Sequence, residues 1–199
     1  EDKVHLLAQA GLEADIVDVD AFALHNSFEI NHPEVLDGIV ALINIGHELT
    51  NVNVLDNGVP TLTRDLTIGT RKIREDLQRE RGLSADDADG LLKGYERSPD
   101  LDPFVQARGE EIAVGLERAS AFLQSASREA GTIERIYCCG GGARVPGLTG
   151  TLNQRLNLPV EVANPIQRLG VKDGVFETVE VDEVAPLLML AAGLALRSG

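Results

Sequence analysis

The chain has 199 residues of ordinary globular composition, 43% hydrophobic and 25% charged, which suffices for one large or two small domains. Its net charge of −14 opposes binding to nucleic acid or to an anionic lipid surface through bulk charge. There is no apolar run as long as a membrane span and no secretory signal pattern at the start. We therefore expect a cytoplasmic protein without direct membrane insertion.

The first predicted elements are helical ends and one short strand. The apolar spacing of residues 4–10, with Gly11 after them, is typical of the last turns of a helix. Residues 16–19 are predicted to form a strand. Asp20 is then expected to cap a helix that the sequence Asn-His-Pro at 31–33 ends.

An antiparallel meander is predicted next. The continuous apolar run 38–46 indicates a strand buried on both faces. Residues 50–54 alternate polar and apolar side chains, and Asp-Asn-Gly at 56–58 is a strong hairpin signal before the strand 59–63. We expect three antiparallel strands, with a tight turn over 46–49 joining the first two.

Helical periodicity dominates the middle of the chain. Ile73 and Leu77 share one face of a helix that Gly82 would end. Ser84, with Asp87 three residues later, is expected to cap a second helix over 85–93.

The last third predicts a loop, a long helix and a second set of strands and helices. Residues 94–103 are rich in proline and charge and predict a loop, after which an amphipathic helix runs from 104 to about 129. The remaining predicted elements are a strand over 136–139, a helix over 148–156, a strand over 160–162, and a buried helix that Asp182 caps and that ends near Arg197.

The two cysteines, Cys138 and Cys139, are adjacent on a predicted buried strand, where successive side chains point to opposite faces. This disfavours a disulfide framework or a zinc site and favours a reducing compartment. The four histidines show no ligand-type spacing, so we expect no metal-ligand cluster. The P-loop, the G-x-G-x-x-G turn after a strand and the G-x-S-x-G elbow are all missing from the sequence.

The stretch YCCGGGARVPGL at 137–148 is the most informative one. A short apolar strand leads directly into Gly140, Gly141 and Gly142, and a new helical pattern follows. Glycine accepts positive φ and lets another molecule approach the main chain closely, so three in a row suggest a ligand site. A sharp turn between a buried strand and a packed helix explains the same residues equally well.

Two weaker signals accompany the glycines. The turn from Asn44 through Gly46 to Thr50 can present N–H groups and a hydroxyl to phosphate oxygens, although a β-turn with a capping Thr is the simpler interpretation. Asp89 and Lys93 share a helix face, for which a solvated ion pair is the simpler interpretation.

Taken together, these motifs resemble the C-terminal half of the actin-like ATPase superfamily, and above all the PilM family of type IV pilus assembly proteins, which is similar to the cell-division protein FtsA. AGLEADIVDVDAFAL resembles the tail of the first domain, INIGHELTNVNVLDNGVPTLTRDL the second phosphate motif, and CCGGGARVPGL the adenosine motif. The resemblance implies an α/β, actin-like (ribonuclease H-like) fold. Residues 1–36 would be the tail of the first lobe, 37–69 and 132–199 the core of the second lobe, and 70–131 an inserted helical subdomain.

By the same resemblance the chain would bind ATP or ADP with Mg²⁺, without an assigned catalytic residue. Phosphates would face Gly46 and Thr50, and Asn44 would approach metal-bound water without ligating the metal directly. The rest of the nucleotide would lie along Gly140, Gly141, Gly142 and Arg144, with the ribose near Asp89.

The chain departs from the family pattern in several places. The family has an acidic residue where Asn44 stands, and losing that charge should weaken Mg²⁺ coordination and water activation. It usually has Glu at Asp89, a lysine one residue before Lys93, and a double glycine at 69–70. The first phosphate loop of the family has no counterpart in this sequence, so these residues alone would not complete an ATP site.

The implied function is a cytoplasmic nucleotide-binding scaffold of the type IV pilus machine, at most a weak ATPase, that supports pilus biogenesis and twitching motility. Implied partners are the cytoplasmic tail of PilN, the pilus assembly ATPase, the inner-membrane platform protein and further copies in a ring, so the protein would be peripheral to the inner membrane through its partners. Alternatives are a sugar- or acetate-kinase-like phosphotransferase, an FtsA-like cell-division protein, and a chain that keeps the fold without the nucleotide. A kinase needs a base and a metal-holding carboxylate, and Asn44 counts against it.

Overall fold

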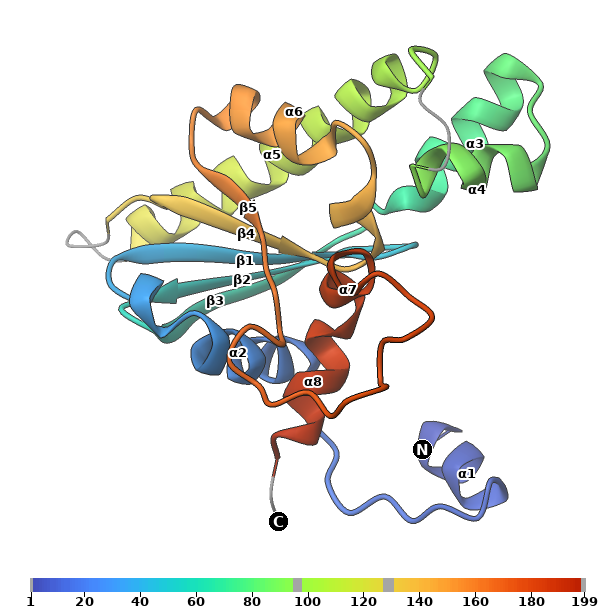
Figure 1. Cartoon of the computed structure of the whole chain (residues 1–199). Coiled ribbons are helices and arrows are strands. Elements are labelled where there is room, and N and C mark those ends of the chain that lie inside the picture. The colour runs from blue at the N-terminus through green and yellow to red at the C-terminus, as the bar shows by residue number, and fades with distance from the viewer. Residues whose placement is uncertain (1, 95–97, 127–130, 198–199) are drawn as a thin grey trace.

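A five-stranded mixed sheet with the strand order β3-β2-β1-β4-β5 organises the fold (Figure 1). The computed structural model describes residues 2–94, 98–126 and 131–197. Helices α5 and α6 cover one face of the sheet and α2 and α8 the other, while α3 and α4 lie beyond one end of it (Figure 1). The strands are β1 (Ile39–Ile45), β2 (Thr50–Asp56), β3 (Val59–Leu66), β4 (Arg135–Cys139) and β5 (Val160–Val162).

The strands confirm the predicted meander. β1 pairs antiparallel with β2, and β2 with β3, whereas β4 runs parallel to β1 and to β5. The hairpin turn between β2 and β3 places Asn57 at φ 48° and Gly58 at φ 77°. Two left-handed residues in succession give a tight turn whose twist matches the strands, and this is why Asn-Gly was a reliable signal.

The helices agree with the periodicity for most of the chain. Gly82 ends α3 in the left-handed conformation, and the Ser84 hydroxyl accepts a hydrogen bond from the Asp87 N–H at the start of α4, as predicted. The helices are α1 (Asp2–Gln9), α2 (Asp20–Asn31), α3 (Thr70–Arg81), α4 (Ala85–Leu92), α5 (Asp102–Ala126), α6 (Leu148–Leu156), α7 (Val181–Val184) and α8 (Met189–Ala195), with short 3₁₀ helices at η1 (Pro33–Val35), η2 (Gly141–Arg144) and η3 (Ala185–Leu188).

Strand β1 lies at the centre of the sheet and is buried on both faces, as its continuous apolar sequence predicted. Ala41 and Ile43 pack into the core under α5 and α6, while Val40 and Leu42 pack into the core against α2 and α8. This is the alternation of a pleated strand with period two. The predicted division of the chain at residues 36, 69 and 131 stays a prediction.

Two predictions near the N-terminus are wrong. Residues 16–19 form no strand, and Val17 is 79% exposed, because no strand of the described chain lies beside this segment to complete a ladder. Asp20 is the first residue of α2 and not its cap. Val19 holds the cap position without a side-chain hydrogen bond, while the neighbouring Asp18 forms an ion pair with Arg197 at 2.7 Å.

The predicted single helix over 182–197 is also wrong. It is divided into α7, η3 and α8, with Pro186 in the short 3₁₀ segment, because proline has no N–H to donate and its ring crowds the preceding turn. Its expected cap, Asp182, lies inside α7, whose cap position is Glu180. Nor is the segment buried all round, since Leu187 and Leu194 are each 44% exposed. The predicted end of the long helix near 129 lies outside the described residues.

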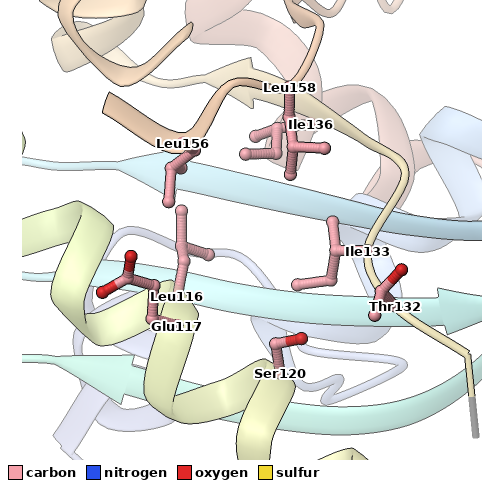
Figure 2. Close-up of a pocket in the computed structure, with 8 residues that line it drawn as sticks. All are labelled: Leu116, Glu117, Ser120, Thr132, Ile133, Ile136, Leu156 and Leu158. Carbon is pink, nitrogen blue, oxygen red and sulfur yellow. The ribbon is translucent and has the colours of Figure 1, made fainter. Parts of the chain in front are cut away.

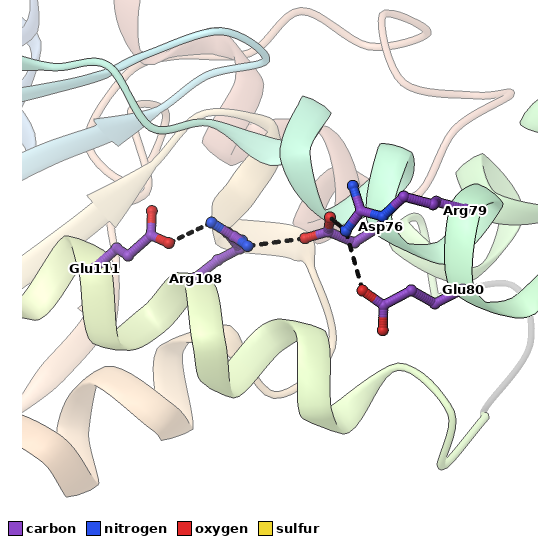
Figure 3. A network of polar contacts seen from close by, with 5 residues as sticks. All are labelled: Asp76, Arg79, Glu80, Arg108 and Glu111. Carbon is purple, nitrogen blue, oxygen red and sulfur yellow. Dashed lines mark hydrogen bonds and ion pairs between the residues drawn. The ribbon is translucent and has the colours of Figure 1, made fainter.

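A network of charged side chains joins α3 to α5 (Figure 3). The buried carboxylate of Asp76 on α3 accepts hydrogen bonds from Arg79 and from Arg108 of α5, the latter at 2.9 Å. Arg108 also contacts Glu111, and Arg79 contacts Glu80 at 3.0 Å. Asp76 therefore links α3 to α5 through a buried carboxylate.

We expect Asp76→Ala to lower the free energy of unfolding by roughly 2–4 kcal/mol, because the largely buried guanidinium of Arg108 loses its buried carboxylate partner and keeps only the more exposed Glu111. The measurement is urea denaturation. Glu80→Ala is the matched control, since that carboxylate is exposed and should change stability by no more than about 0.5 kcal/mol. Equal effects of the two substitutions would show that Asp76 does not hold α3 to α5.

Buried His32 connects α2 to the segment after β5. Its ring stacks on Phe28 at 5.0 Å, and its Nε2 accepts a hydrogen bond from the Asn164 N–H at 3.2 Å, which requires the neutral ring. Burial lowers the pKa of His32 below 6.5, although Glu34 opposes this shift. The folded protein therefore favours neutral histidine at this position.

This pKa shift predicts a loss of stability in acid. The unfolded chain binds a proton at His32 more readily than the folded chain does, so the contribution is complete above pH 6.5 and is lost as the pH falls below it. His32→Gln, whose side-chain oxygen can still accept a hydrogen bond, should make the melting temperature less dependent on pH between about 7 and 5. An unchanged slope in this variant would contradict the assignment.

Candidate functional site

The turns that follow β1 and β4 meet at one edge of the sheet. Because the two strands are parallel and in register from Val40 with Arg135 to Asn44 with Cys139, both end at the same level. Ligands of open α/β sheets bind outside the carboxyl ends of such strands. The candidate site is therefore at this edge.

The three glycines after β4 differ in why the structure needs a residue without a side chain. Gly140 has φ +79°, donates its N–H to the Pro186 carbonyl at 2.9 Å, and would place a Cβ 2.3 Å from Asn44 Oδ1. A Cβ on Gly142 would lie 2.1 Å from Ile45 Cγ2. A Cβ on Gly141, by contrast, would have no described atom within 4 Å. The outer two glycines allow close packing on the end of β1, and the middle one borders open space.

The turn after β1 is held by its own hydrogen bonds and also positions α3. The Gly46 N–H donates to the Leu49 carbonyl at 2.9 Å, and the buried Thr50 hydroxyl donates to the Ile68 carbonyl at 2.8 Å. The Gly46 carbonyl accepts from the Thr70 N–H at 3.0 Å. These groups thus have partners inside the fold, and the contacts of Gly46 and Thr50 with phosphate stay a prediction.

Asn44 belongs to a chain of side-chain hydrogen bonds across three strands. Its Nδ2 donates to Asn51 Oδ1 at 3.1 Å, and Asn51 Nδ2 donates in turn to Asp65 Oδ1 at 2.7 Å. The Asn44 carboxamide is therefore oriented by β2, with its oxygen toward Gly140. Its predicted approach to metal-bound water stays a prediction.

A pocket of about 290 Å3 opens beside the glycine turn. Of the predicted site residues, Asp89, Gly141 and Arg144 line it, whereas Asn44, Gly46, Thr50, Gly140 and Gly142 do not and belong to the two turns behind it. The lining residues are His47, Thr70, Arg74, Asp89, Leu92, Lys93, Gly141, Arg144, Val145 and Leu187.

Positive charge prevails in this pocket. Arg74, Lys93 and Arg144 line it together with one carboxylate, Asp89, in the described part of the chain. Arg74 lies 3.7 Å from Asp89, and its buried Nε has no hydrogen-bond partner among the described atoms. Arg144 forms an ion pair at 3.5 Å with Glu183, which lies outside the lining.

Apolar side chains supply the rest of the lining. Leu92 of α4, Val145 after η2 and Leu187 of η3 contribute aliphatic surface. Cations beside apolar surface suit a ligand with an anionic end and a flat apolar ring. A nucleotide has both.

Sequence analysis did not identify several lining residues. Arg74 follows the core residue Ile73 on α3, and no local pattern shows that α3 docks with Arg74 toward the glycine turn. Leu187 was expected to be buried in a continuous helix. The lining of this pocket comes from five separate segments, so it depends on tertiary packing that periodicity does not report.

A second pocket, of about 260 Å3, lies at the opposite end of β4 (Figure 2). Its only charged lining residue in the described chain is Glu117, whose carboxylate already accepts hydrogen bonds from Arg155, the shorter at 2.8 Å. The remaining lining residues are Leu116, Ser120, Thr132, Ile133, Ile136, Leu156 and Leu158. Without a cation in its lining, this pocket does not suit phosphate.

The cysteines are buried and free, as their strand predicted. Burial raises the pKa of the Cys138 thiol to about 12 and that of the Cys139 thiol still further, so both are protonated at neutral pH. In the described residues no group of three or more His, Cys, Asp and Glu side chains could hold a metal ion. None of the helices in residues 2–94, 98–126 and 131–197 is long and apolar enough to cross a membrane.

Comparison with known proteins places this geometry in context. A family model described as type IV pilus assembly protein PilM matches residues 1–199. Similar solved structures are a PilM-PilN type IV pilus biogenesis complex (28% identity, TM-score 0.81), the ethanolamine utilization protein EutJ from Carboxydothermus hydrogenoformans (23%, 0.68) and MreB 5 of Spiroplasma citri bound to AMPPNP (13%, 0.63). They share the actin-like fold, and the predicted fold class is thereby confirmed. The matches cover 96%, 98% and 98% of this chain but 55%, 59% and 62% of theirs.

The glycine geometry predicts that substitutions of the two outer glycines destabilise the fold and that substitution of the middle one does not. Gly140→Ala and Gly142→Ala should each lower the free energy of unfolding by roughly 1–3 kcal/mol, because the new methyl group meets the end of β1. Gly141→Ala should change it by no more than about 0.5 kcal/mol. The measurement is the midpoint of urea denaturation of each variant. Equal destabilisation by all three substitutions would contradict the structure.

Proposed function

Because the chain belongs to the family of type IV pilus assembly protein PilM, we propose that it contributes the second-lobe part of a nucleotide-binding scaffold in the pilus assembly machine. One observation carries the proposal. The pocket beside the glycine turn brings Gly141 and Arg144 of the adenosine-type motif within the same lining as Asp89 of α4.

The ligand proposed for this pocket is ATP or ADP. Gly141 offers uncovered main chain to the nucleotide, Arg144 and Lys93 offer charge to its anionic groups, and Asp89 can accept hydrogen bonds from the ribose hydroxyls. The described residues contain no group of three or more His, Cys, Asp and Glu side chains that could hold Mg²⁺, so the metal would bind together with the phosphates. That MreB 5 was solved with AMPPNP supports the choice of an adenine nucleotide for this fold.

The proposed role of the nucleotide is structural. Asn44 carries no charge and is hydrogen-bonded to Asn51, so it can neither ligate Mg²⁺ as a carboxylate would nor take a proton from water. The pocket does join the glycine turn to the helical pair α3 and α4. A ligand that binds both parts favours the arrangement in which they are close, which is how occupancy would set the shape offered to partners.

The proposed partners are the cytoplasmic tail of PilN, the pilus assembly ATPase, the inner-membrane platform protein and further copies of the protein in a ring. The 28% identity with the PilM of a PilM-PilN complex supports PilN most directly. The net charge of −14 favours recruitment to the inner membrane by protein partners over lipid, in support of pilus biogenesis and twitching motility. The PilN tail would dock on the first lobe, of which residues 1–36 are the tail in the proposed division.

Nucleotide binding is tested with the full-length protein. Mg-ATP at millimolar concentration should raise its melting temperature, as mass action requires of a ligand of the native state. Gly141→Leu should abolish most of this shift, because the side chain narrows the pocket. Gly150→Leu is the matched control, since a Cβ on that exposed glycine of α6 also has no described atom within 4 Å.

Two results would count against this proposal. If millimolar nucleotide left the melting temperature of the wild type unchanged, the alternative of a fold without its nucleotide would be favoured. A shift that survived in Gly141→Leu would place the nucleotide outside this pocket. Phosphoryl transfer to a small acceptor at rates near those of ordinary enzymes would instead favour the phosphotransferase.

A further inference from the structure

The segment that contains α7 and η3 closes one side of the pocket and is attached to the glycine turn at two points. The Pro186 carbonyl accepts a hydrogen bond from the Gly140 N–H at 2.9 Å, and Leu187 lines the pocket. On α7, Glu183 reaches Arg144 at 3.5 Å. The first attachment fixes the main chain, and the second is made by side chains alone.

The two partners of this ion pair differ in exposure. The Arg144 side chain is 20% exposed and lines the pocket, whereas the Glu183 side chain is 61% exposed and does not. Glu183 can therefore move away into solvent, while Arg144 stays at the pocket. The contact joins one guanidinium nitrogen, Arg144 Nη2, to Glu183 Oε2, so Glu183 occupies the edge of Arg144 that carries this donor.

We infer that Glu183 is a tethered competitor of the anionic ligand of this pocket, which occupies Arg144 until a phosphate-bearing ligand displaces it. The inference rests on the proposed function and adds a regulation to it. A ligand that takes the Nη2 donors of Arg144 has to break this ion pair, so the strength of the pair is subtracted from the binding free energy. For an exposed pair this corresponds to roughly a two- to fivefold loss of affinity.

Displacement also connects the pocket to the surface of the molecule. If Glu183 weakens nucleotide binding, then nucleotide binding weakens the attachment of Glu183 by the same factor. α7 would then be held to the glycine turn by the main-chain bond of Pro186 and no longer by Arg144. Ligand binding in the pocket would thereby loosen the attachment of α7, a helix at the surface.

The test compares Glu183→Gln with Asp182→Asn in the full-length protein, with Mg-ADP as the probe and calorimetry at low salt as the measurement. Both substitutions remove one negative charge from α7, and Asp182 is exposed without an ion pair in the described chain. Glu183→Gln should bind Mg-ADP two- to fivefold more tightly than the wild type. Asp182→Asn should match the wild type.

The gain should also shrink toward unity at about 0.5 M salt, where exposed ion pairs are screened. Equal affinities of the two variants, or a gain that salt does not reduce, would overturn the inference while leaving the proposed function intact. If none of the three proteins bound Mg-ADP, the proposed function itself would fail, and the inference with it.

Discussion

The close approach of the glycine turn to the end of β1 is the constraint on which the site depends. Gly140 and Gly142 lie so near Asn44 and Ile45 that a methyl group on either would overlap them. Because β4 is parallel to β1 and in register with it, this approach brings the two strand-ending turns together at one edge of the sheet. Gly141, between Gly140 and Gly142, borders open space and lines the pocket.

The same edge positions the other walls of the pocket through the main chain. The Gly46 carbonyl accepts the Thr70 N–H, so the start of α3 is fixed at the turn after β1, and α3 in turn carries Arg74 to the pocket. The Pro186 carbonyl accepts the Gly140 N–H, which fixes the C-terminal segment on the opposite side. Main-chain hydrogen bonds thus position the helix that carries Arg74 and the segment that carries Leu187.

Much of the fold could be predicted because its signals are local. Asn57-Gly58 specifies a tight hairpin, Ser84 a helix start, and the apolar run of β1 a strand covered on both faces. The failures are places where the outcome depends on distant neighbours or on one residue. Residues 16–19 have strand propensity without a pairing partner, and Pro186 divides a segment whose periodicity suggested one helix. In the candidate pocket, Asp89, Gly141 and Arg144 belong to local motifs that the sequence displays, whereas Arg74 and Leu187 reach the pocket through packing.

In the proposed function an adenine nucleotide binds at the carboxyl end of β4, between the glycine turn and α4, in a PilM-family scaffold. The test is amide hydrogen exchange of the full-length protein with and without Mg-ADP, because it measures the protection of each segment in one experiment. We expect slower exchange in residues 140–148 and 85–93 and no change in 131–134, at the opposite end of β4. Protection confined to 131–134, or no protection in either pocket, would contradict it.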